Sequence, residues 1–249
     1  MNKKDYTTVQ RHAIVMGATS GIGREVALLL AEKGWHVAVA GRRTDCLEEL
    51  TLTHENIKMA KCVDINAPGA ATALEEMATE LGGMDLYVHS SGIGWQNEAL
   101  EQEKELMTVE TNATGFTRMV SAAFNIMTRE GAGGHIACIS SIAGTKGLGA
   151  APAYSATKRF QAHYMECLAQ LSNKRGLHIT LTDIRPGFVD TPLIAGSDYP
   201  LKLSAAAVAG DIVKAIEKKR GVCIIDWRYR LLVMLWRLIP RCLWVRMKI

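Results

Sequence analysis

Short apolar runs alternate with longer amphipathic stretches from near the start of the chain to about residue 226. Runs typical of buried strands fall at residues 12–17, 35–41, 57–63, 85–89, 134–140, 177–184 and 222–226. Apolar positions at helical spacing predict helices over residues 21–33, 44–54, 68–81, 98–130 (a pair), 152–175 and 204–220. Because this alternation requires parallel pairing and right-handed crossovers, we expect an α/β fold with one doubly wound, seven-stranded parallel sheet covered by helices on both faces.

The composition supports one packed domain, because 48% of the 249 residues are hydrophobic and only 22% are charged. Six cysteines are scattered without a C-x-x-C pair, which predicts free thiols in a reducing compartment and no metal site. The first ten residues are polar and lack the apolar core of a secretory signal. The longest uncharged stretch, residues 131–145, is too short and too rich in Gly to cross a bilayer. We therefore expect a cytoplasmic protein.

The formal net charge of +4 is concentrated at the end of the chain. Residues 222–249 contain six basic side chains and one acid, Asp226, so the rest of the chain is nearly neutral. A nearly neutral body argues against a broad nucleic-acid surface.

A glycine-rich turn follows the first predicted strand, with Gly17, Gly21 and Gly23 directly before the first helix. Glycines allow a tight turn and a close backbone approach to a pyrophosphate. The pyrophosphate then lies at the helix N-terminus, where free N–H groups and the helix dipole favour anions. This strand–turn–helix context predicts a dinucleotide cofactor and a Rossmann-like domain over residues 1–226.

The second predicted strand ends in Gly41, followed by Arg42 and Arg43. NAD-binding proteins usually present an acid here to the ribose 2′-hydroxyl, whereas an arginine accommodates the 2′-phosphate of NADP. Asp45 is better placed at the N-terminus of the next helix than on the ribose. The two arginines therefore favour NADP, and two solvated surface arginines are the alternative.

A candidate catalytic pair is Tyr154 and Lys158, whose i, i+4 spacing places both on one face of the 152–175 helix. A nearby ammonium stabilises a phenolate, so Lys158 together with the positive charge of an oxidised nicotinamide is expected to lower the Tyr154 pKa and let the pair shuttle protons. Ser140 and Ser141 end the 134–140 strand at the same sheet edge. A hydroxyl there can donate to a substrate carbonyl as it gains negative charge.

These motifs, in this order and spacing, resemble the short-chain dehydrogenase/reductase family over residues 12–226. The match consists of the glycine turn, the Y-x-x-x-K of Tyr154 and Lys158, and Ser141 thirteen residues before the tyrosine. Asn112 matches the family's catalytic asparagine, and Asp64 its adenine-contacting acid.

The resemblance implies roles for the matched residues. Tyr154 would be the general acid in reduction and the base in oxidation, and Lys158 would lower its pKa and bind the nicotinamide ribose. Ser141 would orient the carbonyl, and Asn112 would hold a water that relays protons to Lys158. The cofactor would contact Gly17, Thr19, Ser20, Gly21, Ile22, Gly23, Arg42, Arg43, Asp64, Ile65, Ser91, Gly92, Tyr154, Lys158, Pro186, Gly187, Val189 and Thr191.

Two positions depart from the family pattern. After the fourth strand, His89-Ser90-Ser91-Gly92 stands where the family commonly has Asn-Asn-Ala-Gly, and Met16 stands where a threonine commonly precedes the first glycine. Both places serve cofactor placement and sheet stability in the family, so they bear on binding more than on the reaction. We expect His89 to be structural.

A tail, residues 227–249, continues after the last predicted strand with three of the five tryptophans and six basic residues. At helical spacing Arg230, Arg237, Arg241 and Lys248 share one line, with apolar side chains around the rest. Pro240 interrupts the pattern, so it does not predict a membrane span. Two alternatives remain: peripheral contact with an anionic membrane surface, on its inner face, or an arm that packs on its own body or a neighbouring subunit.

The loop of residues 192–203 is short, largely apolar and contains two prolines. By the resemblance it covers the substrate, which favours a small hydrophobic ketone or alcohol, lipid-like or steroid-like. The predicted function is hydride transfer between NADP(H) and a secondary alcohol or ketone. The resemblance also implies a homodimer or homotetramer built on the helices at 111–130 and 152–175. The alternative is a non-catalytic dinucleotide-binding regulator or redox sensor at a membrane, which would need no proton donor.

Overall fold

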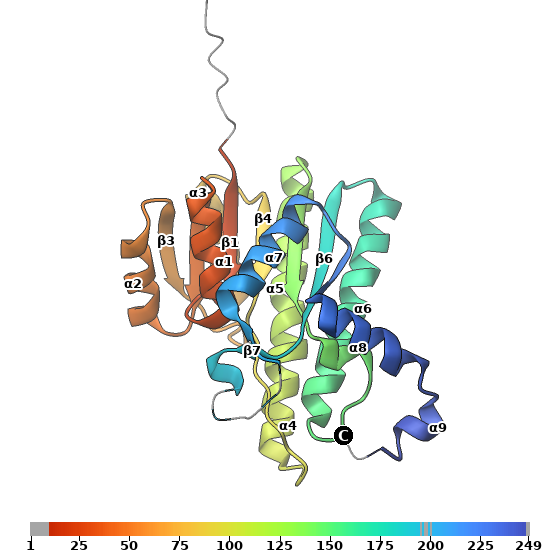
Figure 1. Cartoon of the computed structure of the whole chain (residues 1–249). Helices are drawn as coiled ribbons and strands as arrows, with labels where there is room; N and C mark the ends of the chain where they lie inside the picture. Colours follow the sequence, from red (N-terminus) through yellow and green to blue (C-terminus); the bar gives the residue numbers. More distant parts are fainter. Residues whose placement is uncertain (1–9, 195, 197–198, 200, 248–249) are drawn as a thin grey trace, which may run out of the picture.

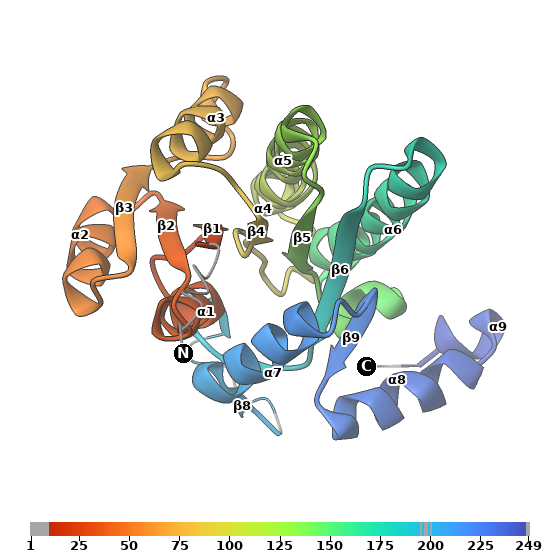
Figure 2. The same cartoon turned by 90° about the horizontal axis from the view of Figure 1, so that it is seen from above.

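The structure is a computed structural model that describes residues 10–194, 196, 199 and 201–247. It has three layers, with one parallel sheet between two layers of helices (Figures 1 and 2). The polar segment at residues 1–9 and Lys248 lie outside the described residues.

Seven parallel strands form the main sheet, in the order β3-β2-β1-β4-β5-β6-β9. They are β1 (His12–Met16), β2 (His36–Gly41), β3 (Ile57–Cys62), β4 (Leu86–His89), β5 (Gly134–Ile139), β6 (Ile179–Pro186) and β9 (Val222–Ile225). All seven were predicted, within a few residues at each end. The predicted parallel, doubly wound sheet is confirmed.

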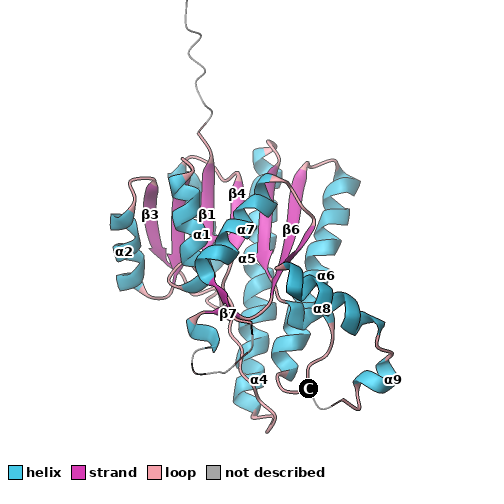
Figure 3. Cartoon of the chain, in the orientation of Figure 1, coloured by secondary structure: helices cyan, strands magenta, loops and turns pink. Residues whose placement is uncertain are grey.

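Helices cover both faces of this sheet (Figure 2). One core contains side chains of α1 (Gly21–Glu32), α2 (Thr44–Thr53) and α7 (Ala205–Glu217). The opposite core contains side chains of α3 (Ala70–Leu81), α5 (Phe116–Glu130) and α6 (Pro152–Arg175). Figure 3 shows the helices flanking the strands.

Strand β1 explains why both cores are apolar. Ala13 and Val15 enter one core while Ile14 and Met16 enter the other, because successive side chains of a strand point to opposite faces. A strand that is buried on both faces therefore has a continuous apolar run instead of an alternating one.

The predicted helical pair at 98–130 is present with a distortion between its halves. Helix α4 (Gln102–Val109) passes through the π-helix η1 (Glu110–Gly115) into α5. A π-helical turn often marks a functional position, and this one contains Asn112.

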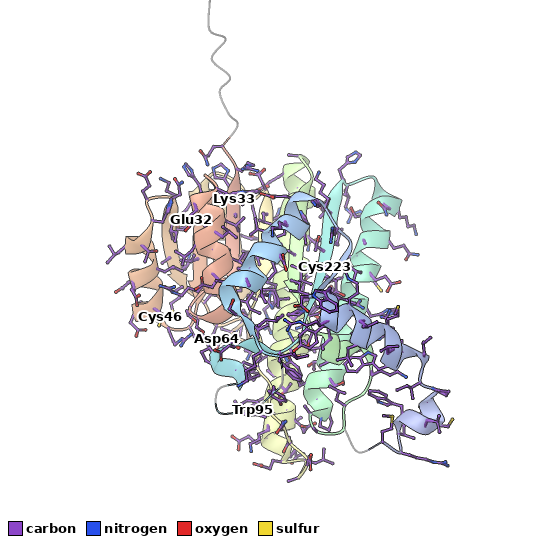
Figure 4. All side chains as sticks on the ribbon, viewed as in Figure 1. Glu32, Lys33, Cys46, Asp64, Trp95 and Cys223 are labelled. Carbon is purple, nitrogen blue, oxygen red and sulfur yellow. The ribbon has the colours of Figure 1, made fainter. Side chains whose placement is uncertain are left out.

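Strand order reverses at β1, which pairs with β2 on one side and with β4 on the other. In such sheets ligands bind beyond the carboxyl ends of the strands at this reversal. Figure 4 shows Asp64 and Trp95 toward that edge and Glu32 and Lys33 toward the opposite edge.

Two short strands lie beyond the main sheet and were not predicted. β7 (Val189–Asp190) pairs in parallel with β8 (Leu203–Ser204). Two-residue strands leave no periodicity in the sequence, because alternation needs four or more positions. The pairing joins the two ends of the 192–202 loop, which begins with a 3₁₀ turn, η3 (Pro192–Ile194).

The tail forms two helices, α8 (Trp227–Leu238) and α9 (Arg241–Trp244), beyond the β9 edge of the sheet (Figures 1 and 2). Tyr229 and Val233 are buried in the core, so the inner side of α8 packs on the body of the same chain. The break between the helices means that the predicted basic line holds within α8 only for Arg230 and Arg237. Over the part of the chain that the structure covers, no helix is long and apolar enough to span a bilayer.

Candidate active site

The phosphate loop lies where β1, β4 and α1 meet. Gly17 has a φ of +89°, and a Cβ atom on it would lie 2.6 Å from the Ser91 nitrogen. A Cβ on Gly23 would lie 2.2 Å from the Gly17 carbonyl oxygen. Neither position admits a side chain, so both glycines are required for the loop to close against residues 90–92.

The N-terminus of α1 is free to bind an anion. Ser20 is the N-cap residue, and its side chain makes no capping hydrogen bond. The first N–H groups of a helix have no partners within the helix, and the helix dipole makes this end positive. Together with the glycines, this end of α1 fits the pyrophosphate of a dinucleotide.

Arg43 lies across the phosphate loop. Its Nη2 atom donates to Thr19 Oγ1 at 2.7 Å and to Ser20 Oγ at 2.6 Å. A Cβ on Gly41 would lie 2.7 Å from Thr19 Cγ2, so strand β2 ends directly against this loop. The arrangement places one guanidinium and two hydroxyls where the ribose 2′-position is expected. Arg42 is exposed.

The loop after β3 presents Asp64 and Ile65 at the same edge. Asp64 is exposed, and its Oδ1 atom accepts a hydrogen bond from the Asn66 backbone N–H at 3.0 Å. Ile65 is buried, and its carbonyl oxygen accepts from Arg118 Nη1 at 2.6 Å. The side chain of Asp64 is thus held at the sheet edge and exposed to solvent.

The two serines after β5 have different surroundings. Ser140 Oγ donates to Asp183 Oδ1, and Asp183 also pairs with Arg185 Nη2 at 2.7 Å. Ser140 is therefore committed to a buried structural network. Ser141 caps the 3₁₀ turn η2 (Ile142–Thr145) by accepting from the Ala143 N–H at 3.1 Å. Its hydroxyl also bonds the Tyr154 side chain.

The protein groups alone raise the pKa of Tyr154 above its ordinary value, so Lys158 without the charge of an oxidised nicotinamide does not produce the expected lowering. Burial is the largest cause, a nearby Tyr199 adds to it, and the hydrogen bond with Ser141 acts in the opposite direction. Lys158 Nζ lies over the Tyr154 ring, 5.7 Å from its centroid. At that distance, and with hydrogen-bond partners of its own, the Lys158 ammonium does not cancel the rise in the Tyr154 pKa that burial causes.

Lys158 is buried and held by two acceptors. Its Nζ atom donates to the Ile139 carbonyl and to Gln161 Oε1, both at 3.0 Å. Burial lowers the pKa of Lys158, and the buried Asp183 acts in the opposite direction.

Asn112 joins the loop after β4 to α6. Its side chain accepts from the Ile93 N–H at 2.9 Å and donates to the Ile93 carbonyl at 2.7 Å. Its own carbonyl accepts from Gln161 Nε2 at 2.9 Å. The side chain of Gln161 connects Asn112 and Lys158 directly. The water that the resemblance implies between them stays a prediction. A Cβ on Gly92 would lie 3.2 Å from Asn112 Oδ1 and 3.4 Å from Lys158 Nζ, so Gly92 also lies against this group.

His89 is buried beneath the site. Its Nδ1 atom shares a hydrogen bond with the Tyr87 hydroxyl at 3.0 Å, and its ring packs edge-on against Phe116. Burial, and secondarily the charge of Lys158, lowers the pKa of His89 from 6.5 to about 3. A histidine that stays neutral throughout the physiological range is consistent with the expected structural role.

The segment after β6 lies between the phosphate loop and the tail. Thr191 lies against the phosphate loop, since a Cβ on Gly21 would lie 3.0 Å from its Cγ2 atom. Val189 is buried, and the backbone of Gly187 lies against the Tyr229 ring of the tail. Gly187 thus contacts the tail and Pro186 pairs with Ile225 of β9, while Thr191 lies against the cofactor loop.

Four residues at the site were not predicted. Gly94 lies against the Tyr154 ring, because a Cβ on it would lie 2.2 Å from Cδ2. Tyr199 stacks on Phe188 with ring centroids 4.0 Å apart, and its hydroxyl accepts from Gln96 Nε2 at 2.6 Å. For Gln161 a signal existed, since i, i+3 spacing from Lys158 places it on the same face of α6. Gln96 and Tyr199 are 103 residues apart, and no local pattern relates them.

Comparisons with known proteins agree with this geometry. A family model described as short chain dehydrogenase matches residues 11–199. An uncharacterized oxidoreductase of Myxococcus xanthus is 36% identical over 197 residues, which cover 77% of each chain.

Solved structures show the same fold. A short-chain type dehydrogenase/reductase from Mycobacterium marinum has a TM-score of 0.79 and 27% identity, covering 88% of this chain and 95% of that one. A variant of actinorhodin polyketide ketoreductase, solved with NADPH, has a TM-score of 0.75 and 25% identity, covering 87% and 95%. With the glycine loop and the Ser141–Tyr154–Lys158 group at one sheet edge, these matches identify the chain as an oxidoreductase of the short-chain dehydrogenase family.

Proposed function

We propose that the protein is an NADP(H)-dependent carbonyl reductase or alcohol dehydrogenase that acts on a small hydrophobic ketone or secondary alcohol. The observation that carries this proposal is the convergence of Ser141, Tyr154 and Lys158, with Asn112 behind them, beside the phosphate loop. When bound, the nicotinamide cofactor would supply or accept the hydride.

The chain's own residues then move the proton. Ser141 donates to the substrate oxygen and holds the Tyr154 hydroxyl next to it. In reduction Tyr154 gives its proton to that oxygen, and a phenol whose pKa is raised by burial is protonated at neutral pH before the transfer. In oxidation Tyr154 must accept a proton, and Lys158 favours this by stabilising the phenolate. Asn112 and Gln161 keep Lys158 in position.

The residues present fit NADP(H). The uncapped end of α1 suits the pyrophosphate, and Arg43 with Thr19 and Ser20 provides a cation and two hydroxyls beside it. The relative that was solved with NADPH supports the same choice. No carboxylate takes the place after Gly41 that an NAD ribose would use.

The surroundings of Tyr154 favour an apolar substrate. The Phe188–Tyr199 ring pair lies beside the site, because Tyr199 is close enough to raise the Tyr154 pKa. Trp95, Leu193 and Leu201 are exposed on the loops around this ring pair. A lipid-like or steroid-like ketone would bury these surfaces.

The test is NADPH consumption by Tyr154→Phe against a panel of hydrophobic ketones. Loss of the proton donor should reduce turnover by at least about a hundredfold while NADPH binding, followed by its fluorescence, is retained. Tyr164→Phe is the matched control, since Tyr164 lies on the same helix but packs on Phe116 and Phe160. Equal turnover by both variants would refute the role of Tyr154.

A second assay addresses the substrate class. Wild-type protein is given the lipid extract or the aqueous extract of the source cells, and NADPH consumption is compared. Turnover confined to the lipid fraction supports the proposed class. Turnover confined to the aqueous fraction would still support an enzyme but would contradict the proposed hydrophobic substrate.

We also propose a homodimer or homotetramer that includes α5 and α6. Phe160 and Leu171 are exposed on α6, and Val109 is exposed at the end of α4. Exposed apolar side chains on neighbouring helices are typical of subunit contacts. Light scattering should give a mass that falls to the monomer value in Phe160→Glu.

The proposed location is the cytoplasm, with the enzyme held peripherally at the inner face of a membrane by its tail. The cysteines in the described residues are all free thiols, as a reducing compartment requires. The basic excess of the tail suits an anionic leaflet.

A further inference from the structure

Helix α8 has an apolar face on the side opposite to its buried stripe. At about 100° per residue, Tyr229 and Val233 share the inner side. The large apolar residues on the opposite side of the helix are Trp227, Leu231, Met234, Leu235 and Leu238. All five are exposed, Trp227 at 69% and Leu238 at 75%. A surface helix normally places polar residues on its outer side, whereas the outer side of α8 is apolar.

The apolar face belongs to an element that is fixed to the body. Trp236 Nε1 donates to Thr145 Oγ1 at 3.0 Å, and Trp244 Nε1 donates to the Gly147 carbonyl at 2.7 Å. Lys146 Nζ donates to the Ile239 carbonyl at 2.7 Å. These bonds hold α8 and α9 in a set orientation, which leaves the outer face of α8 directed away from the protein.

Cationic side chains border this face. Arg230 and Arg237 lie on one flank of α8, and both are exposed. Arg241 and Arg246 are exposed in and after α9, beside the exposed Leu243. None of the four makes an ion pair with another described residue. The acid of α8's N-cap, Asp226, already pairs with Arg228 at 2.8 Å.

We infer that the outer face of α8, continued by α9, docks on the surface of an anionic lipid bilayer. The apolar residues enter the boundary between headgroups and acyl chains, and the flanking arginines bind the phosphates. A second copy of the chain is disfavoured, because a two-fold contact would bring the same arginines together with no free acid from the tail to pair with them.

Docking also orients the site. The Tyr229 hydroxyl donates to the Leu201 carbonyl at 3.0 Å, which connects the inner side of α8 to the loop that carries Tyr199. Lys146 and Gly147, which hold the tail, follow Ser141 by only a few residues. If the proposed function is correct, the bilayer that holds α8 is also the source from which a hydrophobic ketone reaches the site. The docking itself does not depend on that function.

The experiment is co-sedimentation of the full chain with phosphatidylcholine vesicles that contain phosphatidylglycerol. Wild-type protein should sediment with these vesicles, and less with phosphatidylcholine alone or at high salt. Replacing two apolar residues by Leu235→Glu with Leu238→Glu should weaken partitioning at least about tenfold. Leu52→Glu is the matched control, since Leu52 is 87% exposed on α2, away from the tail.

The outcomes separate the proposals. Wild-type protein that stays in the supernatant, or equal binding by the double variant and Leu52→Glu, would overturn the docking. A dimer that the same two substitutions dissociate would identify a second copy as the occupant instead. NADPH turnover with a water-soluble ketone should be the same in all variants. Vesicle binding without turnover of any ketone would overturn the proposed function and leave the docking intact.

Discussion

Gln161 Oε1 accepts a hydrogen bond from Lys158 Nζ at 3.0 Å, on the same face of α6. The other end of the same amide donates to the Asn112 carbonyl at 2.9 Å. Gln161 is fully buried, so water does not compete for either bond. One side chain therefore fixes the ammonium of Lys158 relative to the π-helical segment that carries Asn112, and Gln161 is a positioning residue.

We predict that Gln161→Leu impairs alcohol oxidation and moves the acidic limb of the kcat–pH profile to higher pH. An acceptor on Nζ favours the charged form of Lys158, so its loss lowers the pKa of Lys158 further. A weaker ammonium stabilises the Tyr154 phenolate less. The loss of a charged hydrogen bond, about 1.5–3 kcal/mol, corresponds to a kcat about ten- to hundredfold lower. The measurement is kcat against pH with NADP⁺ and a secondary alcohol.

Gln161→Glu is the partner variant for this experiment. It keeps an acceptor for Lys158 and removes the donor to Asn112, so it separates the two bonds. A Gln161→Leu protein with a lower melting temperature but an unmoved pH limb would show that Gln161 serves only the fold.

A second prediction concerns Gly94→Ala. The added methyl would lie 2.2 Å from Tyr154 Cδ2, so the phenol must move away from Ser141. We expect turnover to fall at least about tenfold with little change in NADPH affinity, because displacement of a reacting group by about 1 Å is costly. Gly149→Ala is the control, since a Cβ there meets no atom within 4 Å. Equal activity of the two variants would contradict the contact.

A third prediction concerns cofactor choice. Arg43→Ala removes the guanidinium that bonds Thr19 and Ser20, and should raise the KM for NADPH about ten- to hundredfold with little effect on the KM for NADH. Arg42→Ala should have the smaller effect, because Arg42 makes no side-chain contact with the phosphate loop in the structure. Steady-state kinetics with both cofactors measure this. Equal losses for NADPH and NADH would place the 2′-phosphate elsewhere.

The sheet was predictable from the sequence because each of its strands has a strong local signature. Strand β1 has four buried residues in a row, and Gly17 follows directly. The spacing of Tyr154, Lys158 and Ser141 was also local, since one helix and one strand position all three. The residues that were missed depend on the tertiary fold. Gly94 belongs to the site because the Tyr154 ring lies against it, and Tyr199 because Phe188 stacks on its ring and Gln96 bonds its hydroxyl.

The charge state of the site was also outside the reach of sequence reasoning. The i, i+4 spacing of Tyr154 and Lys158 correctly placed the two on one face of a helix, but the direction of the Tyr154 pKa depends on burial. Desolvation of the phenol exceeds the other effects, and no sequence pattern reports the packing of Gly94 or Tyr199 around it.

A fourth prediction concerns stability at acidic pH. The pKa of His89 is 6.5 in the unfolded chain and about 3 in the folded one, because burial disfavours its charge. The unfolded state therefore binds a proton that the folded state rejects between these values. Stability from this group is fully present above pH 6.5 and falls toward pH 3 by about 1.4 kcal/mol per pH unit.

His89→Asn should remove this dependence, and Asn can still accept the Tyr87 hydroxyl bond. Urea unfolding at several pH values gives the free energy of unfolding for both proteins. The remaining slope should reflect other groups such as His135, whose pKa burial lowers to about 4. Parallel curves for wild type and His89→Asn would contradict the buried neutral histidine.

The last prediction tests how the tail supports the site. Tyr229 is buried against Gly187, and its hydroxyl donates to the Leu201 carbonyl at 3.0 Å. Tyr229→Ala should lower the free energy of unfolding by about 3–5 kcal/mol, because a large aromatic side chain leaves a cavity between β6 and α8. Tyr229→Phe should cost about 1 kcal/mol, since it retains the ring and loses the bond to the 192–202 loop. Trp227→Ala, at an exposed position of the same helix, should change the value by less than about 0.5 kcal/mol. Urea denaturation measures all three, and an equal effect of Tyr229→Ala and Trp227→Ala would show that α8 does not pack on the body as the structure places it.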